Sequence, residues 1–182
     1  MGAFLPAEAL TLSSSPCVIE LHSQRRLRYL PARFGLIYLI SCVWSGIARD
    51  MEFCNTAGAA KHQAVALMST ADLSVFYRCK FDAYQDTLYQ HSNRQFYRLC
   101  NIYGTVDFIF GNSAVVFQNC NILPKNPMPS QQNTITAQGK IDPNQNTGIA
   151  IQNCTVWPSA NLTGVKPLHL STDQSIIATH SR

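Results

Sequence analysis

The fold is decided by residues 75–122, where one short pattern of residue types occurs three times: Val75-Phe76-Tyr77-Arg78-Cys79-Lys80-Phe81, Phe96-Tyr97-Arg98-Leu99-Cys100-Asn101-Ile102 and Val116-Phe117-Gln118-Asn119-Cys120-Asn121-Ile122. Related stretches precede and follow it at 51–56 and 149–156. In each stretch apolar and polar side chains alternate with period two, which is typical of a half-buried strand. A Cys or Thr recurs at positions 56, 79, 100, 120 and 154, so the successive steps along the chain are 23, 21, 20 and 34.

This spacing predicts a solenoid, because each strand is too short to bury its own apolar face and must stack on its neighbours. Each of the three shorter steps is one coil. The longest step contains an insert, Lys125 to Gln145, whose Pro, Asn and Gln residues predict a surface loop. The predicted fold class is therefore all-β, a parallel β-helix. An antiparallel sandwich is the alternative, although the chain has no Asn-Gly or Asp-Gly hairpin signal.

Composition and charge exclude several classes of protein. Hydrophobic residues make up 46% and charged residues 13% of the 182 positions, which excludes disorder from low hydrophobicity and high charge. The net charge of +4 is spread along the chain, so a dedicated nucleic-acid binder is not expected. The longest apolar run, Phe34 to Trp44, is too short to span a bilayer. Basic residues precede it as in a signal peptide, but it starts too far into the chain for a normal signal.

Seven cysteines allow two arrangements. The chain has no Cys-x-x-Cys pair and no Cys–His spacing typical of a zinc site. Cys79 and Cys100, like Cys120 and Cys154, occupy equivalent positions on successive coils, so disulfide distance is feasible for each pair. Stacked free thiols would pack equally well, and both possibilities stay open.

The repeat also predicts where polar side chains meet. Residues at the same offset from the repeat position stack on neighbouring coils, about 4.8 Å apart. Seven residues past positions 56, 79 and 100 are Gln63, Asp86 and Asp107, which should form one column with Gln85 beside it. Ten residues past positions 79 and 100 are Tyr89 and Phe110, an aromatic pair on the same side.

Two acids stacked this closely cannot both ionise cheaply, so one pKa should rise while the other carboxyl stays ionised. Such a pair supplies a carboxylate nucleophile or base together with a proton donor. Glutamine amides beside it could donate hydrogen bonds to a developing oxyanion. The alternative is an Asp ladder that only satisfies the amides of its turns.

At these residues the chain resembles the plant pectin methylesterases. The matching blocks are residues 63–67, Tyr84-Gln85-Asp86-Thr87-Leu88-Tyr89 and Gly104-Thr105-Val106-Asp107-Phe108-Ile109-Phe110-Gly111, with further matches at 47–50, 55–58 and 133–139. The likeness covers roughly residues 45–166. It implies a right-handed parallel β-helix, in agreement with the repeat.

The resemblance also implies a site and a reaction. Asp107 corresponds to the nucleophile that attacks the methyl ester of a galacturonate unit, and Asp86 to the acid that protonates methanol and then activates water. Gln85 and Gln63 correspond to the oxyanion donors, and Tyr89 and Phe110 to aromatics that bind the sugar. The implied substrate is methyl-esterified pectin of the extracellular plant cell wall. A proteinaceous inhibitor is a possible partner, and no metal or organic cofactor is implied.

The ends of the chain depart from the family. Residues 1–44 do not resemble the family and are expected to form a leader, a displaced signal or an anchor-like segment. Residues 167–182 are expected to be a non-family tail, so the β-helix domain, 45–166, is expected to be incomplete at both ends. The family's Leu-Gly-Arg-Pro-Trp block, whose arginine orients the nucleophile, has no counterpart here, so weak or no activity is expected. The alternatives are a non-catalytic remnant that binds polysaccharide or inhibitor, and a β-helix pectin glycosidase or lyase. A lyase would need a calcium site of clustered acids, for which Asp82, Asp86 and Asp107 are the candidates.

Overall fold

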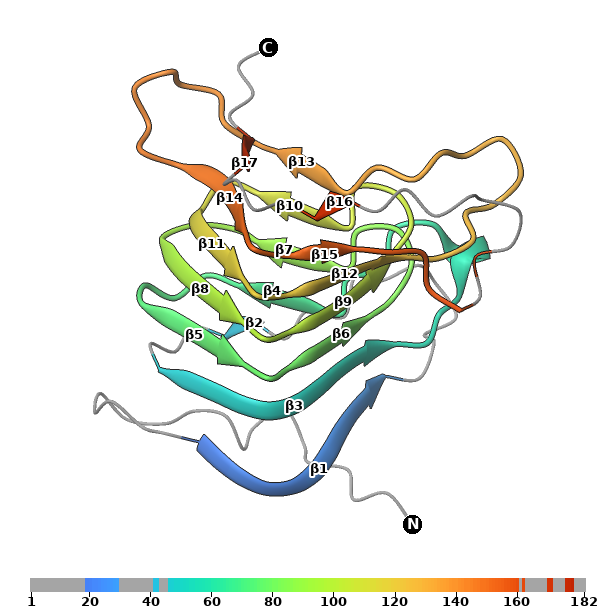
Figure 1. Ribbon diagram of the computed structural model, residues 1–182, viewed down its shortest axis with the longest axis horizontal. Helices are drawn as coiled ribbons and strands as arrows, with labels where there is room; N and C mark the ends of the chain where they lie inside the picture. The colour runs from blue at the N-terminus through green and yellow to red at the C-terminus, as the bar shows by residue number, and fades with distance from the viewer. Residues whose placement is uncertain are drawn as a thin grey trace.

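The computed structural model describes residues 19–29, 41–42, 46–160, 162, 170–171 and 176–178, with side chains for 46–160 and 162. The chain winds as a stack of coils, and each coil lays its strands over those of the coil before it (Figure 1). Pairing between successive coils is parallel throughout. The predicted parallel β-helix is confirmed, and the antiparallel sandwich is wrong.

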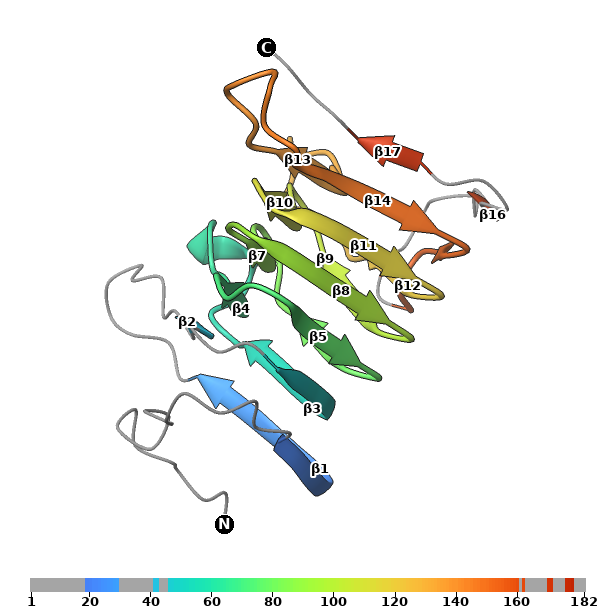
Figure 2. The same ribbon diagram turned by 90° about the vertical axis from the view of Figure 1, so that its left-hand side faces the viewer.

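The strands form three columns, which we number in the order that the chain visits them. The first contains β5 (Ser74–Tyr77), β8 (Arg94–Arg98), β11 (Ala114–Gln118) and β14 (Gly148–Gln152). The second contains β6 (Lys80–Asp82), β9 (Asn101–Gly104), β12 (Asn121–Pro124) and β15 (Thr155–Val156). The long strand β3 (Ile47–Asn55) lies below both columns, pairing with β5 through its first half and with β6 through its second. Figure 2 shows the first column as a ladder of parallel strands.

The third column contains β2 (Ser41–Cys42), β4 (Leu67–Ser69), β7 (Leu88–Gln90), β10 (Ile109–Gly111) and β13 (Thr136–Gln138). A short 3-10 helix, η2 (Ala59–Lys61), lies between β3 and β4. At the ends of the stack, β1 (Ile19–Tyr29) pairs parallel with β3, while β16 (Leu170–Ser171) and β17 (Ile176–Ala178) pair antiparallel with β15 and β14. Among the described residues, no helix has the length and apolar character needed to cross a membrane.

The register confirms three of the four predicted steps and corrects the first. Val75 pairs with Phe96, Phe96 with Val116, and Val116 with Ala150, so the steps of 21, 20 and 34 are confirmed. In the first coil Glu52 pairs with Lys80, which makes that step 28 and not 23. The residue equivalent to Cys79 is therefore Met51 and not Thr56. The prediction failed because β3 runs on to Asn55 and the chain then adds a long connection before β4.

The predicted surface insert, residues 125–145, is only partly a loop. Its middle forms β13, which pairs in parallel with β10 and so supplies the third column of its own coil. Its first residue, Lys125, is buried rather than exposed. The insert was predicted to be a surface loop because it is rich in Pro, Asn and Gln. Its strand has only three residues, which is too short to give a recognisable pattern in the sequence.

The interior is filled by side chains stacked from coil to coil. Tyr97 lies between Phe76 and Phe117, with ring centroids 4.7 Å from each, and Phe53 stacks on Phe81 at 5.2 Å. All five side chains are at most 2% exposed. Since neighbouring coils put the same kind of residue at the same position, flat rings pack face to face with little empty space.

The corner between the first and second columns repeats on every coil. A residue with a left-handed backbone turns the chain there, namely Asp50, Arg78, Leu99, Asn119 and Asn153. From the second coil onward a buried cysteine follows it, and the thiols of Cys79, Cys100, Cys120 and Cys154 each donate to a carbonyl of the coil below. None of these cysteines is joined to another by a disulfide, so of the two open arrangements the structure has stacked thiols.

Replacing Phe76 by Ala should destabilise the stack by about 3–5 kcal/mol, because it removes a fully buried ring between two others. Phe96→Ala on the next coil is the control, since its outward side chain is only half-buried and should cost clearly less. Urea unfolding followed by circular dichroism measures both. Equal losses for the two variants would contradict the assignment of the inward face.

Candidate active site

The candidate site lies at the corner between the second and third columns, where two successive coils each carry an aspartate. Asp86 lies between β6 and β7, and Asp107 between β9 and β10. Both have a left-handed backbone, with φ of 60° and 47°, a conformation that Asp tolerates better than most residues. The amide of Asp86 donates to the carbonyl of Val106 at 3.0 Å, and the pairing of Leu88 with Ile109 fixes one corner above the other. The structure therefore brings the two acids together.

The two carboxyl groups interact electrostatically. The pKa of Asp86 is raised to about 6, first by burial and then by the negative charge of Asp107, while a hydrogen bond from the side chain of Gln63 opposes the rise. Both aspartates are half-buried. A carboxyl group in this environment holds its proton to a higher pH than an exposed one, which is what a proton donor near neutral pH requires.

Gln63 reaches the pair from the coil below, but one position away from the predicted column. Its backbone pairs with Gln85, whereas equal offset from the repeat predicted pairing with Asp86. The prediction counted from Thr56, which is not the true repeat position. The buried amide of Asn55 donates to the carbonyl of Val65 at 3.0 Å and ties the connection that carries Gln63 to the end of β3.

Threonine and glycine hold the two acidic corners in place. The buried hydroxyl of Thr87 lies 3.1 Å from the carbonyl oxygen of Tyr84 and 2.9 Å from that of Tyr103, so it bridges the two coils. The amide of Thr105 donates to the same Tyr84 carbonyl at 2.9 Å. A Cβ on Gly104 would lie 2.2 Å from the Cβ of Phe108, so only glycine fits where the corner of Asp107 begins.

An aromatic stack stands beside the acids on the outer face of the third column. Tyr89 and Phe110 are parallel, with ring centroids 4.5 Å apart, as the repeat predicted. The register continues this stripe with Met68 below and Ala137 above, and the ring of His91 packs edge-on against Tyr89 at 5.1 Å. Sequence reasoning missed these three neighbours. Tyr89 lies one coil before Phe110 in the sequence, and the same spacing counted back from Tyr89 gives Met68.

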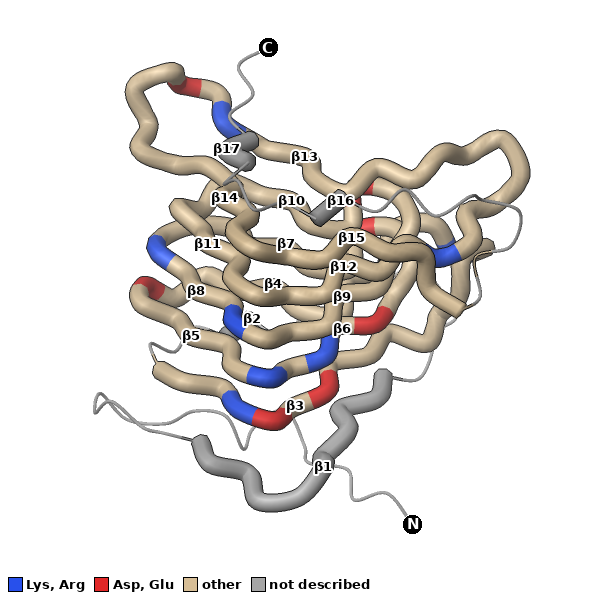
Figure 3. Tube along the Cα trace, viewed as in Figure 1, with Lys and Arg blue, Asp and Glu red and all other residues tan. Residues whose placement is uncertain are grey.

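Asp82 does not join the acidic pair. Its carboxylate binds the ammonium groups of Lys80 at 3.0 Å and Lys125 at 2.9 Å. Burial works against its ionisation, but the bonds from Lys125 and Lys80 keep the pKa of Asp82 below its usual range. Figure 3 shows such mixed charges gathered around β3 and β6. The calcium site that a lyase would need therefore lacks its third acid.

Ligand atoms of Glu52, Cys54 and Asp82 lie within 4.8 Å of one another, a spacing that could hold a metal ion. Lys80 already binds Glu52 at 3.0 Å, and the Cys54 thiol donates to the same carboxylate at 3.1 Å. Burial, together with this hydrogen bond, raises the pKa of Cys54 to about 12, which disfavours the thiolate that a metal would require. The lysine ammonium groups supply the positive charge of this cluster.

Comparison with known proteins identifies the family. The family model described as Pectinesterase matches residues 41–171. The chain belongs to the pectinesterase family. It is 71% identical over 120 residues to the probable pectinesterase/pectinesterase inhibitor 46 of Arabidopsis thaliana, covering 66% of this chain and 21% of that protein. It is 69% identical over 115 residues to pectinesterase 3 of Phaseolus vulgaris, covering 63% and 20%.

Solved pectin methylesterases share the fold. The enzyme from carrot matches with a TM-score of 0.65 and 58% identity over 66% of this chain and 38% of its own. A pectin methylesterase in complex with a hexasaccharide matches with a TM-score of 0.58 and 28% identity, covering 64% of this chain and 40% of its own. The chain spans about a fifth of the length of the curated pectinesterases that it matches. The resemblance drawn from the motif blocks is confirmed at the level of the family.

The raised pKa of Asp86 makes a prediction about stability. A carboxyl whose pKa is higher in the folded than in the unfolded chain stabilises the fold at low pH, and this contribution is lost as the pH rises from about 4 through about 6. Asp86→Asn should therefore be more stable than wild type at pH 7, and this advantage should shrink at pH 4. Chemical unfolding of both proteins at the two pH values measures the difference. Asp142→Asn, in an exposed loop, is the control and should show neither effect.

Proposed function

We propose that this chain carries the ester-hydrolysing site of a pectin methylesterase, and that its substrate is the methyl-esterified galacturonate chain of pectin. The observation that carries the proposal is the pair Asp86 and Asp107 on adjacent coils, one with its pKa raised to about 6. Membership of the pectinesterase family supports the same reaction. The site belongs, on this proposal, to an extracellular protein of the plant cell wall.

The raised pKa of Asp86 supports the roles that we propose for the first half of the reaction. On this proposal Asp86 acts in its protonated form, which its raised pKa favours, and Asp107 is the nucleophile that attacks the ester carbonyl carbon. The carbonyl oxygen gains the electron pair and the tetrahedral intermediate forms. When the bond to the methoxy oxygen breaks, that oxygen takes the proton of Asp86 and leaves as methanol. Asp107 is then joined to the galacturonate as an acyl anhydride.

The second half restores both acids. Asp86, now a carboxylate, takes a proton from a water molecule as the water oxygen attacks the galacturonate carbonyl carbon. The bond to Asp107 breaks, which releases its carboxylate and the free acid of the sugar. Asp86 keeps the proton for the next cycle. Pairing two carboxyl groups of unequal pKa lets one group act first as acid and then as base.

On this proposal Gln63 and Gln85 stabilise the tetrahedral intermediate. Their backbones pair across adjacent coils, next to the acidic corner, and the side chain of Gln63 already donates to Asp86. An amide that turns from Asp86 to the substrate oxygen would stabilise the negative charge that develops there. Removing one such donor commonly costs about 100- to 1,000-fold in kcat.

The stack of Tyr89 and Phe110 suits a sugar ring. Both side chains are half-buried on the outer face, and their parallel rings present an apolar edge a few residues from the acids. A galacturonate unit has one face of C–H groups that packs well on aromatic surface. Met68 widens the same stripe by one coil. A proteinaceous inhibitor that covers this face remains a prediction from the family.

Methanol release from highly methyl-esterified pectin tests the proposal. The purified chain should release methanol only slowly, since no residue matches the orienting arginine of the family, and Asp107→Asn should remove this release because the amide is no nucleophile. Asp142→Asn is the matched control and should retain the wild-type rate. Product analysis separates the other readings, since a glycosidase produces reducing ends and a lyase produces unsaturated ends.

Two outcomes would overturn the proposal. One is equal methanol release by wild type and Asp107→Asn. The other is no methanol release by a chain that circular dichroism shows to be folded, which would leave a protein that at most binds the polysaccharide. Binding without turnover is measured separately by co-sedimentation with pectin.

A further inference from the structure

Lys125 is a buried cation that the proposed reaction does not use. It follows directly after β12 and is only 9% exposed, although lysine is rarely buried without strong partners. Its backbone amide donates to the carbonyl of Gly104 at 2.7 Å. Gly104 ends β9 and begins the corner that carries Asp107, so the main chain of Lys125 is fixed to the coil of the proposed nucleophile.

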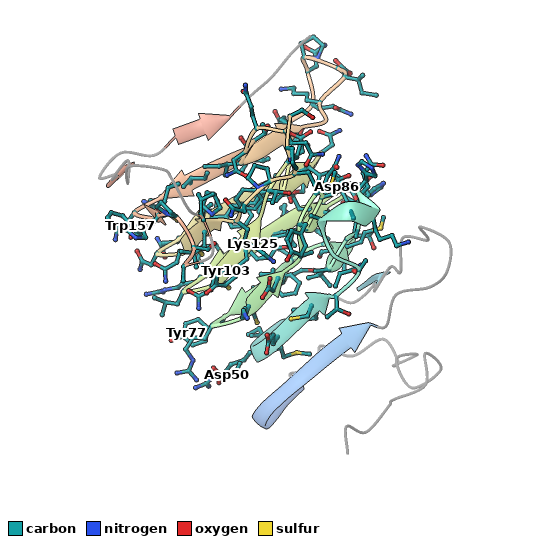
Figure 4. The ribbon with its side chains drawn as sticks, turned by 90° about the vertical axis from the view of Figure 1, so that its right-hand side faces the viewer. Asp50, Tyr77, Asp86, Tyr103, Lys125 and Trp157 are labelled. Atoms are coloured by element: carbon teal, nitrogen blue, oxygen red, sulfur yellow. The ribbon has the colours of Figure 1, made fainter. Side chains whose placement is uncertain are left out.

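The side chain of Lys125 reaches the coil that carries Asp86. Its Nζ donates to the carbonyl of Ala83 at 2.8 Å and to Asp82 Oδ1 at 2.9 Å, and it lies 3.7 Å from the ring centroid of Tyr84. These three residues lead directly into Gln85 and Asp86. Since β12 pairs with β9 and β9 with β6, the side chain reaches from the coil of β12 past the coil of β9 to the coil of β6. Figure 4 views this side of the molecule with Lys125 and Asp86 labelled.

We propose that Lys125 is a positioning residue that fixes the spacing between Asp86 and Asp107. The inference rests on the proposed function and adds a residue to it. One residue is bonded through its main chain to the corner of Asp107 and through its ammonium group to the residues before Asp86. Three partners satisfy the three N–H donors of the ammonium group, so it is held in one direction. A shift of about 1 Å at a reacting group can cost about 100-fold in rate, so a residue that fixes the spacing of the two carboxyl groups affects the rate.

Lys80 offers a matched control, because it shares a partner with Lys125 without touching the corner. Its ammonium binds Asp82 at 3.0 Å and Glu52 at 3.0 Å, and lies 5.1 Å from the ring centroid of Tyr103. Loss of Lys80 therefore removes a positive charge from the same carboxylate. An effect that is found for Lys125 and absent for Lys80 comes from the contacts with Ala83 and Tyr84 and not from charge balance.

The experiment compares Lys125→Met with Lys80→Met in the full chain, and its main readouts need no turnover. Titration of the Asp86 carboxyl by carbon-13 NMR should give a pKa of about 6 in wild type and Lys80→Met. In Lys125→Met the pKa of Asp86 should fall toward the ordinary value of an aspartate, because the corner that carries Asp86 is released and moves away from Asp107 and into water. The amide of Asp86, bonded to Val106, should exchange its hydrogen at least about tenfold faster in Lys125→Met.

Kinetic measurements on Lys125→Met and Lys125→Arg provide a second test of the proposal. With methyl-esterified pectin, Lys125→Met should lower kcat at least about tenfold while KM changes less than about twofold, as expected when alignment rather than binding is lost. Lys125→Arg should restore a large part of the rate, since a guanidinium group can still donate to Asp82 and to the Ala83 carbonyl.

Misfolding is controlled by a second pair of variants. Lys125→Met leaves Asp82 with one cation fewer, which could unfold the chain. Asp82→Asn/Lys125→Met removes both charges of that pair and still lacks the contacts with Ala83 and Tyr84, and Asp82→Asn/Lys80→Met is its control. The proposal is overturned if the folded Lys125 variants keep the wild-type Asp86 pKa and amide exchange. It stands, and only the proposed function fails, if these readouts shift as expected while Asp107→Asn releases methanol at the wild-type rate.

Discussion

Parallel hydrogen bonding between successive coils is the constraint on which the rest of the structure depends. It holds equivalent residues one above the other, so any residue type that recurs at the coil spacing becomes a stack. The rings of Phe76, Tyr97 and Phe117 stack in this way inside the protein, and Tyr89 and Phe110 do so outside. The buried thiols and the two acidic corners follow the same rule. The residues of the proposed site lie one coil apart, so the same strand register that aligns the core side chains also brings the site residues together.

The same register creates the electrostatic contrast within one short segment. Asp82 and Asp86 are close in the chain and both are partly buried, yet the pKa of the first is lowered and that of the second is raised. The ammonium groups of Lys80, on the same strand, and of Lys125, from a later coil, bind Asp82, whereas stacking places another carboxylate near Asp86. An opposite charge favours ionisation, whereas burial beside a like charge opposes it. Burying Asp86 beside a like charge costs free energy of folding. Hydrogen bonds from Thr87 and Lys125 to the backbone just before Asp86 help to offset this cost.

Sequence reasoning succeeded where the repeat was regular and failed where the coil length changed. The three steps between residues 75 and 150, the parallel fold and the aromatic pair followed from periodicity. The first coil was misaligned because Met51 stands at its corner where the later coils have Cys, and the error moved Gln63 by one position relative to Asp86. The strand in the insert was missed because so short a strand with polar neighbours shows no period. Trp157, a large apolar residue, is 40% exposed near the end of the described coils (Figure 4).

By itself, the sequence determined the parallel β-helix, the membership of the pectinesterase family and the meeting of Asp86 with Asp107, because each depends on residue types repeated at a nearly constant spacing. The tertiary structure alone decided that the pKa of Asp86 is raised, which side chains reach across coils and whether the stacked cysteines bond to one another. Those properties depend on burial and on the direction of individual side chains. Lys125 shows the difference, since its place in the sequence suggests an exposed loop, and only its position in the folded chain puts its ammonium group against Asp82, Ala83 and Tyr84.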